Sequence, residues 1–386
     1  MKVVLGSHYF FPHIGGIESV VESHAERLAG RGHDVTVVSS NAGADSFNSR
    51  QDGYKVRRFK AWNPTESFGV PYPVPSPIDA GRKLRDTLED REVDLVHVHG
   101  LNYLTTTAIL RHVPSSTPVV MHQHTPFVEY PFPIQQIEQV NDHLVGRWNL
   151  RQANLVFCIN PNIEQYVQKL EPSTNTELLM NGVDTEFFNP RRGQEASPFN
   201  CDSDATVLFT LSRMSQKKGI DVLLEAIQRI GQESMGIHFA VAGDGPMRGE
   251  VEKIAQKTKN MEIMGRLTDN ELASCYAAAD AFVFTSKSGE AFPTLTMIEA
   301  LSSGTPVIAS ELAENPIGVR DRTNSILFEP GDAGGLINAI TEMATDRNHL
   351  PKMSEKAREA AEKQFSIEDR IDQLEMSYES LIELSN

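Results

Sequence analysis

Short apolar runs alternate with amphipathic stretches along the whole chain, a pattern typical of βα units on a parallel sheet. In the first half, the runs that predict strands are Lys2–Gly6, Asp34–Ser39, Lys55–Phe59, Asp94–His99, Pro118–His122 and Leu155–Cys158. In the second half they are Ala205–Leu211, His238–Ala242, Met261–Met264, Ala281–Thr285, Pro306–Ala309 and Ser325–Phe328. Apolar residues at helical spacing lie between them, as in Ile17–Arg31, so we predict two doubly wound α/β domains.

The boundary between the two domains is predicted from composition. Asn189–Asp204 is polar, has proline near both ends and lacks periodicity, as expected of a linker. We therefore place the domains at 1–190 and 197–366. The amphipathic segment 367–386 is followed by no strand, and we expect it to pack back on the first domain. Two doubly wound domains facing each other would hold a ligand in the cleft, at the carboxyl ends of both sheets.

Composition and charge exclude several classes of function. The 386 residues carry a formal net charge of −16, which argues against a nucleic-acid-binding surface and an extended basic membrane patch. The three cysteines are far apart and predict reduced packing residues. Without a long apolar run or a signal-peptide pattern, the sequence predicts a cytoplasmic protein.

Two glutamates, Glu290 and Glu299, lie at a predicted strand-to-helix junction within Ser288–Ser310. Carboxylates accept hydrogen bonds from vicinal sugar hydroxyls, and the free N–H groups of a helix start attract phosphate. The junction therefore suits a sugar beside a phosphate. An ordinary capped helix with one buried glutamate would show the same pattern.

Glycines and cations at two further strand ends also suit a phosphate. Gly15 and Gly16 open the helix after the first strand, where the backbone can approach a ligand closely. Arg213 and Lys218 follow the first strand of the second half and can engage phosphate oxygens. Each feature alone is equally compatible with a plain turn or with solvated surface charge.

Histidine pairs at two other strand ends raise the question of a metal. His97 and His99 share one strand face, as do His122 and His124. No cysteine or carboxylate completes either set in sequence, so we predict hydrogen-bonding histidines, no metal site and no cofactor.

Taken together, eight segments in order resemble the retaining nucleotide-sugar glycosyltransferases of family 4, which have the GT-B fold. These segments are PHIGGIESVV, GHDVTVVSS, DLVHVHG, PVVMHQHTP, NGVDTEFFNP, LSRMSQKKGIDVLLEAI, VAGDGP and EALSSGTPVIAS. The resemblance implies that the first domain binds the acceptor and the second the nucleotide sugar. It implies transfer of a hexosyl group from a UDP- or GDP-linked donor to a glycan or lipid-linked acceptor, with retention and without a metal.

The resemblance also assigns roles to residues of this chain. His124, Arg213, Lys218 and Glu290 would act in catalysis, with His124 near the reacting carbon and Glu290 on the transferred sugar. Glu299 would hold the ribose, and the diphosphate would lie between Gly15–Gly16 and the two cations. The remaining donor contacts would come from Gly265, Arg266, Leu267, Phe292, Thr294 and Leu295. Eight residues separate Glu290 from Glu299, one more than is usual in the family, which places the position of Glu290 in question.

The acceptor side is less defined by the sequence. Tyr9–His13 and Pro126–Pro133 are candidate acceptor contacts, whereas the amphipathic run Ile134–Trp148 is expected to pack in the core. A peripheral contact with the inner membrane face stays open, and so does the oligomeric state. The alternatives to a transferase are a sugar-nucleotide epimerase, a glycosidase using both glutamates, and a non-catalytic sugar-nucleotide binding protein.

Overall fold

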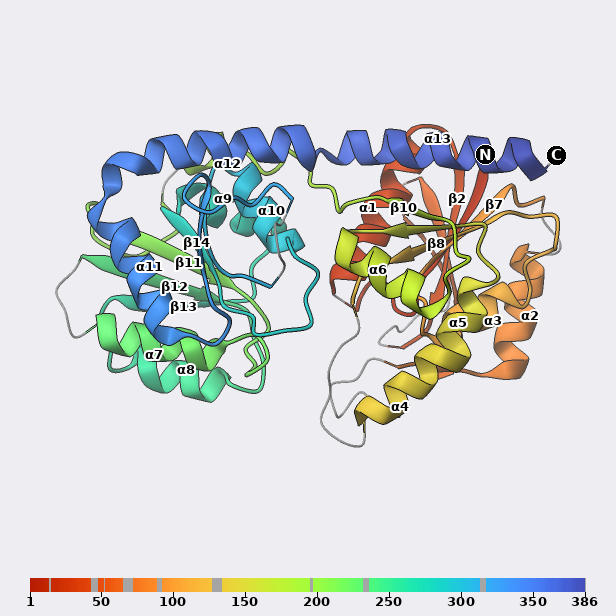
Figure 1. Cartoon of the computed structure of the whole chain (residues 1–386), viewed down its shortest axis with the longest axis horizontal. Coiled ribbons are helices and arrows are strands. Elements are labelled where there is room, and N and C mark those ends of the chain that lie inside the picture. The colour runs from red at the N-terminus through yellow and green to blue at the C-terminus, as the bar shows by residue number, and fades with distance from the viewer. Residues whose placement is uncertain are drawn as a thin grey trace. The chain divides into compact units, whose positions relative to one another are not determined.

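The computed structural model describes most of the chain: residues 1–13, 15–42, 48–51, 53–64, 72–88, 92–126, 134–194, 197–231, 236–312 and 317–385. The chain forms two compact units (Figure 1). The N-terminal unit comprises Met1–Met180 and Arg370–Asn386, and the C-terminal unit comprises Asn181–Asp369. Each unit is a largely parallel sheet with helices on both faces, so the predicted fold class is confirmed.

The sheet of the N-terminal unit has the strand order β10-β9-β8-β7-β1-β2-β4-β3. Its strands are β1 (Lys2–Gly6), β2 (Asp34–Ser40), β3 (Asn48–Gln51), β4 (Tyr54–Phe59), β7 (Leu95–His99), β8 (Val119–Gln123), β9 (Leu155–Cys158) and β10 (Thr176–Leu178). β5 (Ala61–Trp62) and β6 (Val74–Pro75) form a separate antiparallel pair. β7, β8 and β9 are buried along their whole length, as expected for parallel strands covered on both faces.

Helices cover this sheet, and the last of them ends the chain. They are α1 (Gly16–Gly30), α2 (Pro77–Leu88), α3 (Leu104–Leu110), α4 (Ile134–Asn141), α5 (Arg147–Leu150), α6 (Pro161–Leu170) and α13 (Ile367–Ser385). Residues of α13 are tied to the N-terminal unit: Arg31 pairs with Asp372 at 2.5 Å, and Tyr378 is hydrogen-bonded to His97 Nδ1 at 2.6 Å. Residues 370–386 therefore belong to this unit although they end the chain.

The sheet of the C-terminal unit has the order β13-β12-β11-β14-β15-β16, with every pair parallel. Its strands are β11 (Thr206–Leu211), β12 (Ile237–Ala242), β13 (Met261–Gly265), β14 (Ala281–Phe284), β15 (Val307–Ser310) and β16 (Ser325–Phe328). Its helices are α7 (Ile220–Ile230), α8 (Arg248–Ala255), α9 (Asp269–Ala278), α10 (Leu295–Ser302), α11 (Ala333–Thr345) and α12 (Leu350–Gln364). Figure 1 shows α7, α8 and α11 on one side of this sheet and α9, α10 and α12 on the other.

Local sequence explains where several helices begin. Thr268 caps α9 in a capping box with Glu271, and Asn160 caps α6 through the amide of Ile163. All the predicted strands form, with ends that differ by no more than one residue. The strands that the sequence did not predict are β3, β5, β6 and β10, which are short and carry few apolar residues in a row.

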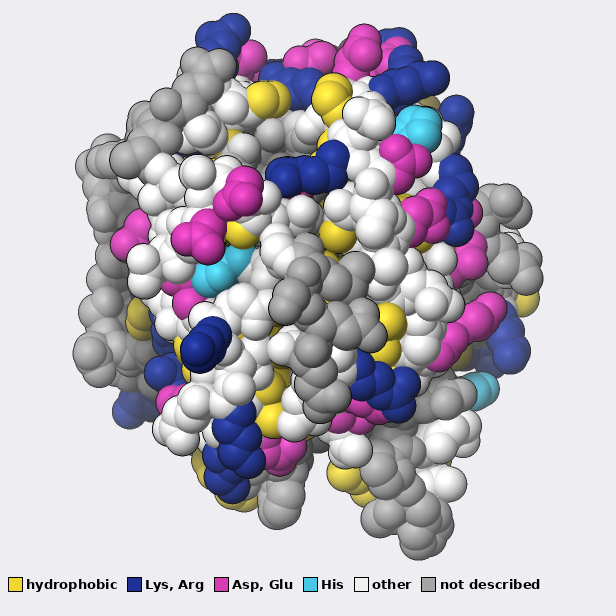
Figure 2. Space-filling view, turned by 90° about the vertical axis from the view of Figure 1, so that its left-hand side faces the viewer, with side chains coloured by type: hydrophobic (Ala, Val, Ile, Leu, Met, Phe, Trp, Pro, Cys, Tyr) yellow, Lys and Arg dark blue, Asp and Glu magenta, His cyan; other side chains and the backbone are white. Residues whose placement is uncertain are grey.

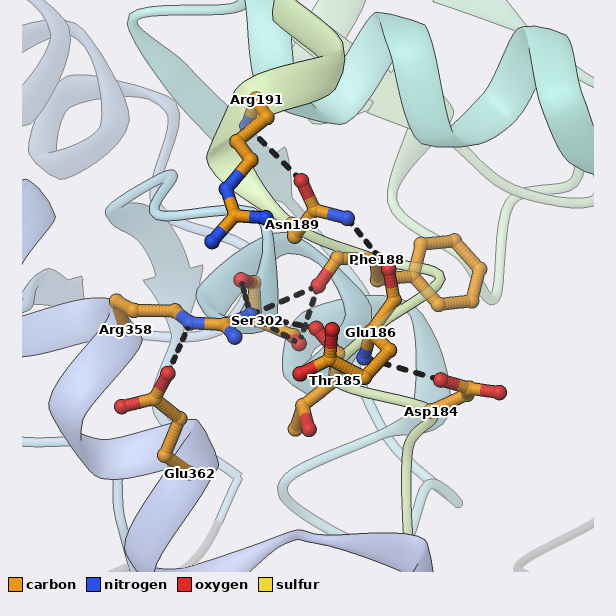
Figure 3. Close-up of polar contacts among 9 residues, drawn as sticks. All are labelled: Asp184, Thr185, Glu186, Phe188, Asn189, Arg191, Ser302, Arg358 and Glu362. Carbon is orange, nitrogen blue, oxygen red and sulfur yellow. Dashed lines mark hydrogen bonds and ion pairs between the residues drawn. The ribbon is translucent and has the colours of Figure 1, made fainter.

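The boundary between the units differs from the prediction. Residues 181–190, predicted to end the first domain, belong to the C-terminal unit. Figure 3 shows the reason: Arg358 of α12 donates to the carbonyl oxygens of Thr185 (2.9 Å), Phe188 (3.0 Å) and Ser302 (2.7 Å). The Ser302 hydroxyl also donates to the Phe188 carbonyl at 2.7 Å, so the segment is fastened to α10 and α12. The predicted linker contains a 3₁₀ turn, Pro190–Gln194.

Acidic and basic side chains are interspersed on the face of the molecule that Figure 2 shows. Many of the exposed ion pairs join residues three or four apart on one helix, such as Arg229 with Glu225 and Lys363 with Glu359. Such exposed pairs contribute little to stability, and they indicate a solvated surface.

Candidate functional site

The candidate site of the C-terminal unit lies where the order of its strands reverses. β11 lies between β12 and β14, so the chain leaves β11 toward one edge of the sheet and later returns on its other side. In open α/β sheets, ligands bind at this switch point, beyond the carboxyl ends of the strands. Residues 212–219 follow β11 and residues 285–294 follow β14, so both segments meet at this place.

Hydrogen bonds to backbone carbonyls hold these two segments together. The Thr285 hydroxyl donates to the Lys218 carbonyl at 2.9 Å, and the Lys287 amide donates to the Lys217 carbonyl at 2.9 Å. Gly219 lies in the contact with a φ of +68°, and a Cβ added there would stand 1.8 Å from the Thr285 carbonyl oxygen. The turn can therefore approach β14 only with glycine at this position.

The switch point brings three of the predicted catalytic residues into this region. Lys218 forms an ion pair with Glu290, with both side chains about a quarter exposed or less. Glu290 thus lies beside the turn after β11 despite the longer spacing to Glu299. Arg213 is exposed, and among the described residues no ion pair or hydrogen bond of its side chain is found. Its guanidinium is therefore available to an anion.

Glu299 lies on α10 and is bonded to α9. The Tyr276 hydroxyl donates to its carboxylate at 3.0 Å. Burial raises the pKa of Glu299 from 4.5 to about 7, although the Tyr276 hydrogen bond opposes this shift. The carboxyl group therefore titrates near neutral pH. Tyr276 precedes Glu299 by 23 residues, and no local sequence signal indicated this partner.

The other residues predicted to contact the donor lie in different environments. Thr294 is the N-cap of α10 but makes no capping hydrogen bond with its side chain, and Leu295 is the first helical residue. Phe292 is only 3% exposed and its ring packs on Phe284, so its predicted donor contact stays a prediction.

Gly265 ends β13, and Arg266 and Leu267 follow it at the carboxyl edge of the same sheet. The Gly265 carbonyl accepts from the Gly243 amide at 2.7 Å, which joins this segment to the loop after β12. The Arg266 side chain is 79% exposed, and its Nε lies 3.9 Å from Asp244. Backbone groups of this segment therefore lie at the carboxyl edge, as a nucleobase contact requires.

In the N-terminal unit, the start of α1 already carries a carboxylate. Gly15 is the N-cap of α1, and Gly16 is its first residue. Glu18 in the first turn is buried and accepts from His13 Nδ1 at 2.9 Å. Burial alone would raise the pKa of Glu18, but the His13 hydrogen bond and His8 hold it below its usual value. An anion at Gly15–Gly16 would meet this negative charge, a feature that the prediction did not include although Glu18 is visible in the sequence.

His124 is buried among other histidines. Its Nε2 lies 2.8 Å from His99 Nδ1, and its ring stacks on His122 with centroids 4.3 Å apart. Burial lowers the pKa of His124 to about 3, so the imidazole is neutral at physiological pH. His124 can therefore serve a ligand through hydrogen bonds but not through a positive charge.

The expectation for the run Ile134–Trp148 was wrong. The run forms α4, a π-helical turn at Asp142–Gly146 and the start of α5, and none of the residues of α4 is buried. Ile137 (63%), Val140 (57%) and Leu144 (68%) are exposed on it. Of the candidate acceptor contacts, residues 127–133 lie outside the described part of the chain, whereas Tyr9 is buried and stacks on His13. The described residues contain no helix long and apolar enough to span a bilayer.

The glutamates of the C-terminal unit have separate partners. Glu290 pairs with Lys218 and Glu299 with Tyr276, so neither carboxyl group is bonded to the other. A glycosidase would use the pair as acid and nucleophile on one glycosidic bond. It would also leave Arg213 and Lys218 without a function.

Comparison with known proteins identifies the class. Residues 14–187 match the family model described as Glycosyltransferase Family 4, and residues 205–346 match the one described as Glycosyl transferases group 1. The phosphatidylinositol N-acetylglucosaminyltransferase gpi3 subunit of Schizosaccharomyces pombe is 22% identical, over 98% of this chain and 81% of the relative. A GDP-mannose-dependent α-(1-6)-phosphatidylinositol monomannoside mannosyltransferase of Mycobacterium tuberculosis is 24% identical, over 93% of each chain.

A solved structure supports the same conclusion for the fold. HepE of Anabaena in complex with UDP superimposes with a TM-score of 0.75 at 19% identity, over 98% of this chain and all of that one. The protein is a glycosyltransferase with the GT-B fold. It belongs to glycosyltransferase family 4, as the eight sequence segments predict.

Proposed function

We propose that this chain transfers a hexosyl group from a UDP- or GDP-linked sugar to a glycan or lipid-linked acceptor, with retention of configuration. The observation that supports this most directly is the grouping at the switch point of the C-terminal unit. An exposed arginine (Arg213), a lysine beside a glutamate (Lys218 and Glu290) and a titratable Glu299 belong to the segments gathered there or to the helix that follows them. A nucleotide sugar combines the diphosphate and hydroxyl groups that these side chains recognise.

Arg213 and Lys218 stabilise the charge that develops on the departing nucleoside diphosphate. Positive charge placed at a leaving group is commonly the largest single contribution to such a reaction. Glu290, next to Lys218, accepts from hydroxyls of the transferred sugar, and Glu299 accepts from the ribose. Since the side chains supply the cations, the reaction needs no metal, and activity should persist in excess chelator.

Retention follows if the acceptor attacks on the face that the diphosphate leaves. A donor phosphate oxygen then takes the acceptor's proton as the new glycosidic bond forms and the bond to the diphosphate breaks. The neutral His124 holds a sugar hydroxyl by hydrogen bonding. The anomeric configuration of the product, read by NMR, tests this assignment, and an inverted product would contradict it.

Ligand-dependent thermal stability is the test that needs no acceptor. UDP, GDP, ADP and their sugar conjugates are added without metal to the purified chain, and the midpoint of unfolding is measured. One nucleotide should raise the midpoint in the wild type and leave Arg213→Ala unchanged. If no nucleotide shifts the wild type, the proposed donor site is wrong.

The pH dependence of nucleotide binding tests the role of Glu299. With a pKa of about 7, Glu299 is half ionised at neutral pH, and the carboxylate needed by the ribose hydroxyls becomes the minor form at lower pH. Affinity for the preferred nucleotide should therefore fall as pH drops below 7, by up to about tenfold per pH unit. Titration calorimetry from pH 5.5 to 8.5 measures the affinity as a function of pH. In Glu299→Gln the affinity should depend less on pH than in the wild type. An equal slope in both proteins would exclude Glu299 as its source.

The same pKa predicts an effect on stability with the opposite sign. Glu299 is protonated in the folded state up to about pH 7, whereas its unfolded value is 4.5. Between these values the folded state holds more protons, so the free energy of unfolding falls as pH rises, by about 3 kcal/mol in all. Glu299→Gln should lose this dependence in urea titrations.

The acceptor class is proposed from an exposed apolar face of the N-terminal unit. Ile137, Val140 and Leu144 repeat at helical spacing along α4 and the π-helical turn, with more than half of each side chain exposed. Both relatives described above have a phosphatidylinositol compound in their names. We propose that this face lies on the membrane surface and that the acceptor is lipid-linked.

Vesicle binding tests the exposed face. Ile137→Gln, Val140→Gln and Leu144→Gln combined should weaken cosedimentation with phosphatidylinositol-containing vesicles by at least about 100-fold. Burying a whole apolar side chain contributes roughly 1.5–3 kcal/mol, and more than half of each of these three is exposed. Met376→Gln, at an exposed apolar residue of α13, is the matched control and should bind as the wild type does. Equal binding by the triple variant would contradict the membrane contact, while leaving the donor site untouched.

A further inference from the structure

Five buried histidines form a cluster inside the N-terminal unit. They are His24 of α1, His97 and His99 of β7, and His122 and His124 at the end of β8, each with 6% or less of its surface exposed. Their rings lie against one another; for example, the centroids of His97 and His99 are 4.5 Å apart, and those of His24 and His99 are 5.9 Å apart. Such a grouping of imidazoles is unusual because each buried ring nitrogen needs a partner.

Four of these histidines have a ring nitrogen with no partner. Among the described residues, His24 Nδ1, His97 Nε2, His99 Nε2 and His122 Nδ1 are buried and make no hydrogen bond. One ligand nitrogen from each of His24, His97 and His99 lies within 4.8 Å of the others, and the same holds for His99, His122 and His124. In the first set every ring has an unpartnered nitrogen, whereas His124 of the second set has none. An unsatisfied buried polar atom costs about 1–3 kcal/mol, so the first set calls for an occupant that all three rings can bind.

The opposite nitrogens of two of these rings are already fixed. His97 Nδ1 lies 2.6 Å from the Tyr378 hydroxyl, and His99 Nδ1 lies 2.8 Å from His124 Nε2. Metal-binding histidines typically have this arrangement, in which one nitrogen is held by an outer partner and the other is left for the ion.

We propose that His24, His97 and His99 form a binding site for a divalent transition metal of the zinc class. Three neutral imidazoles without a carboxylate or thiolate favour Zn²⁺, Co²⁺, Ni²⁺ or Cu²⁺ over Mg²⁺ or Ca²⁺. Three protein ligands leave a fourth tetrahedral position for solvent. Nitrogens bound to one zinc lie roughly 3.3–3.4 Å apart, given a Zn–N distance of about 2.0–2.1 Å, so the rings draw together on binding.

The metal site uses no residue of the C-terminal unit, and it joins α1 to β7. It lies next to one proposed donor contact, because its ligand His99 is hydrogen-bonded to His124. Because the ligands are buried, the ion enters as the chain folds and resists removal by a chelator afterwards. Metal-independent transfer and a resident ion are therefore compatible, and the tests below do not depend on activity.

Metal content is the first test. Untagged protein is produced in zinc-supplemented medium, desalted over a chelating resin and measured by plasma mass spectrometry. We expect one zinc per chain, reduced at least tenfold in His24→Gln and in His97→Gln. His349→Gln, at an exposed histidine, is the matched control and should keep the ion. Wild-type protein without bound metal, or equal zinc in His97→Gln, would overturn the proposal.

Cobalt spectroscopy tests the site in the wild-type protein, so a variant that fails to fold does not affect the result. Wild-type protein refolded with Co²⁺ should show the visible absorption bands of a tetrahedral nitrogen-ligated ion, and Zn²⁺ should abolish them. Tyr378→Phe keeps all three ligands but removes the partner of His97, so cobalt affinity should fall about 10–100-fold with the bands retained. A natively folded wild type without these bands would refute the site, and a buried water would then be the better partner for the three nitrogens.

Discussion

Replacing Arg213 with alanine is expected to lower the turnover of the nucleotide sugar by about 100-fold or more, with little change in the unfolding midpoint. A preorganised charge aimed at a leaving group typically contributes about 10²–10³ in rate. Arg213 is exposed, and its side chain makes no hydrogen bond or ion pair with the described residues. Replacing it therefore removes no such contact from that part of the chain. Release of nucleoside diphosphate, with the donor identified by thermal stability, measures the effect.

Lys218→Ala should lower turnover by a similar factor, and its interpretation needs one control. Removing Lys218 also leaves Glu290 without its ion-pair partner. The double variant Lys218→Ala/Glu290→Gln removes that unpaired charge and should be as slow as the single variant or slower. Arg229→Ala, with an exposed side chain on α7, is the control and should retain near-normal turnover. If Arg213→Ala and Lys218→Ala both react normally, the two cations do not bind the leaving group.

Replacing Gly219 with alanine should reduce the free energy of unfolding by more than about 3 kcal/mol. The left-handed conformation at φ +68° costs a residue with a side chain about 1–2 kcal/mol, and the added Cβ would stand 1.8 Å from the Thr285 carbonyl oxygen. The turn that carries Lys218 must then move away from β14. Nucleotide affinity should consequently fall together with stability, as urea unfolding and calorimetry would show.

Gly331→Ala is the matched control for this prediction. Gly331 has a φ of +84°, but a Cβ added there meets nothing within 4 Å. Gly331→Ala should therefore lower the free energy of unfolding only by the cost of the left-handed conformation, about 1–2 kcal/mol, and leave nucleotide binding unchanged. Equal losses in the two variants would show that the close approach to Thr285 contributes nothing.

The sequence was sufficient to predict the longer strands and the family. Long apolar runs such as Asp34–Ser39 and Ala205–Leu211 specify buried parallel strands because both faces of such strands are covered. The short strands β3, β5, β6 and β10 were not predicted, since a few residues with mixed polarity carry no clear period. The boundary at residue 190 was also misplaced. The contacts of Arg358 with Thr185 and Phe188 join residues that are 170 or more positions apart.

For the site, the sequence by itself determined which residue types follow which strands, and hence that Arg213, Lys218, Glu290 and Glu299 were candidates. This is possible because the end of a strand and the start of the next helix are local features. The tertiary structure decided what these residues meet: Glu290 beside Lys218, Glu299 on Tyr276, and five histidines in one buried cluster. Partners, burial and pKa depend on which strands become neighbours, and strand order is set by packing of the whole sheet rather than by any local stretch of sequence.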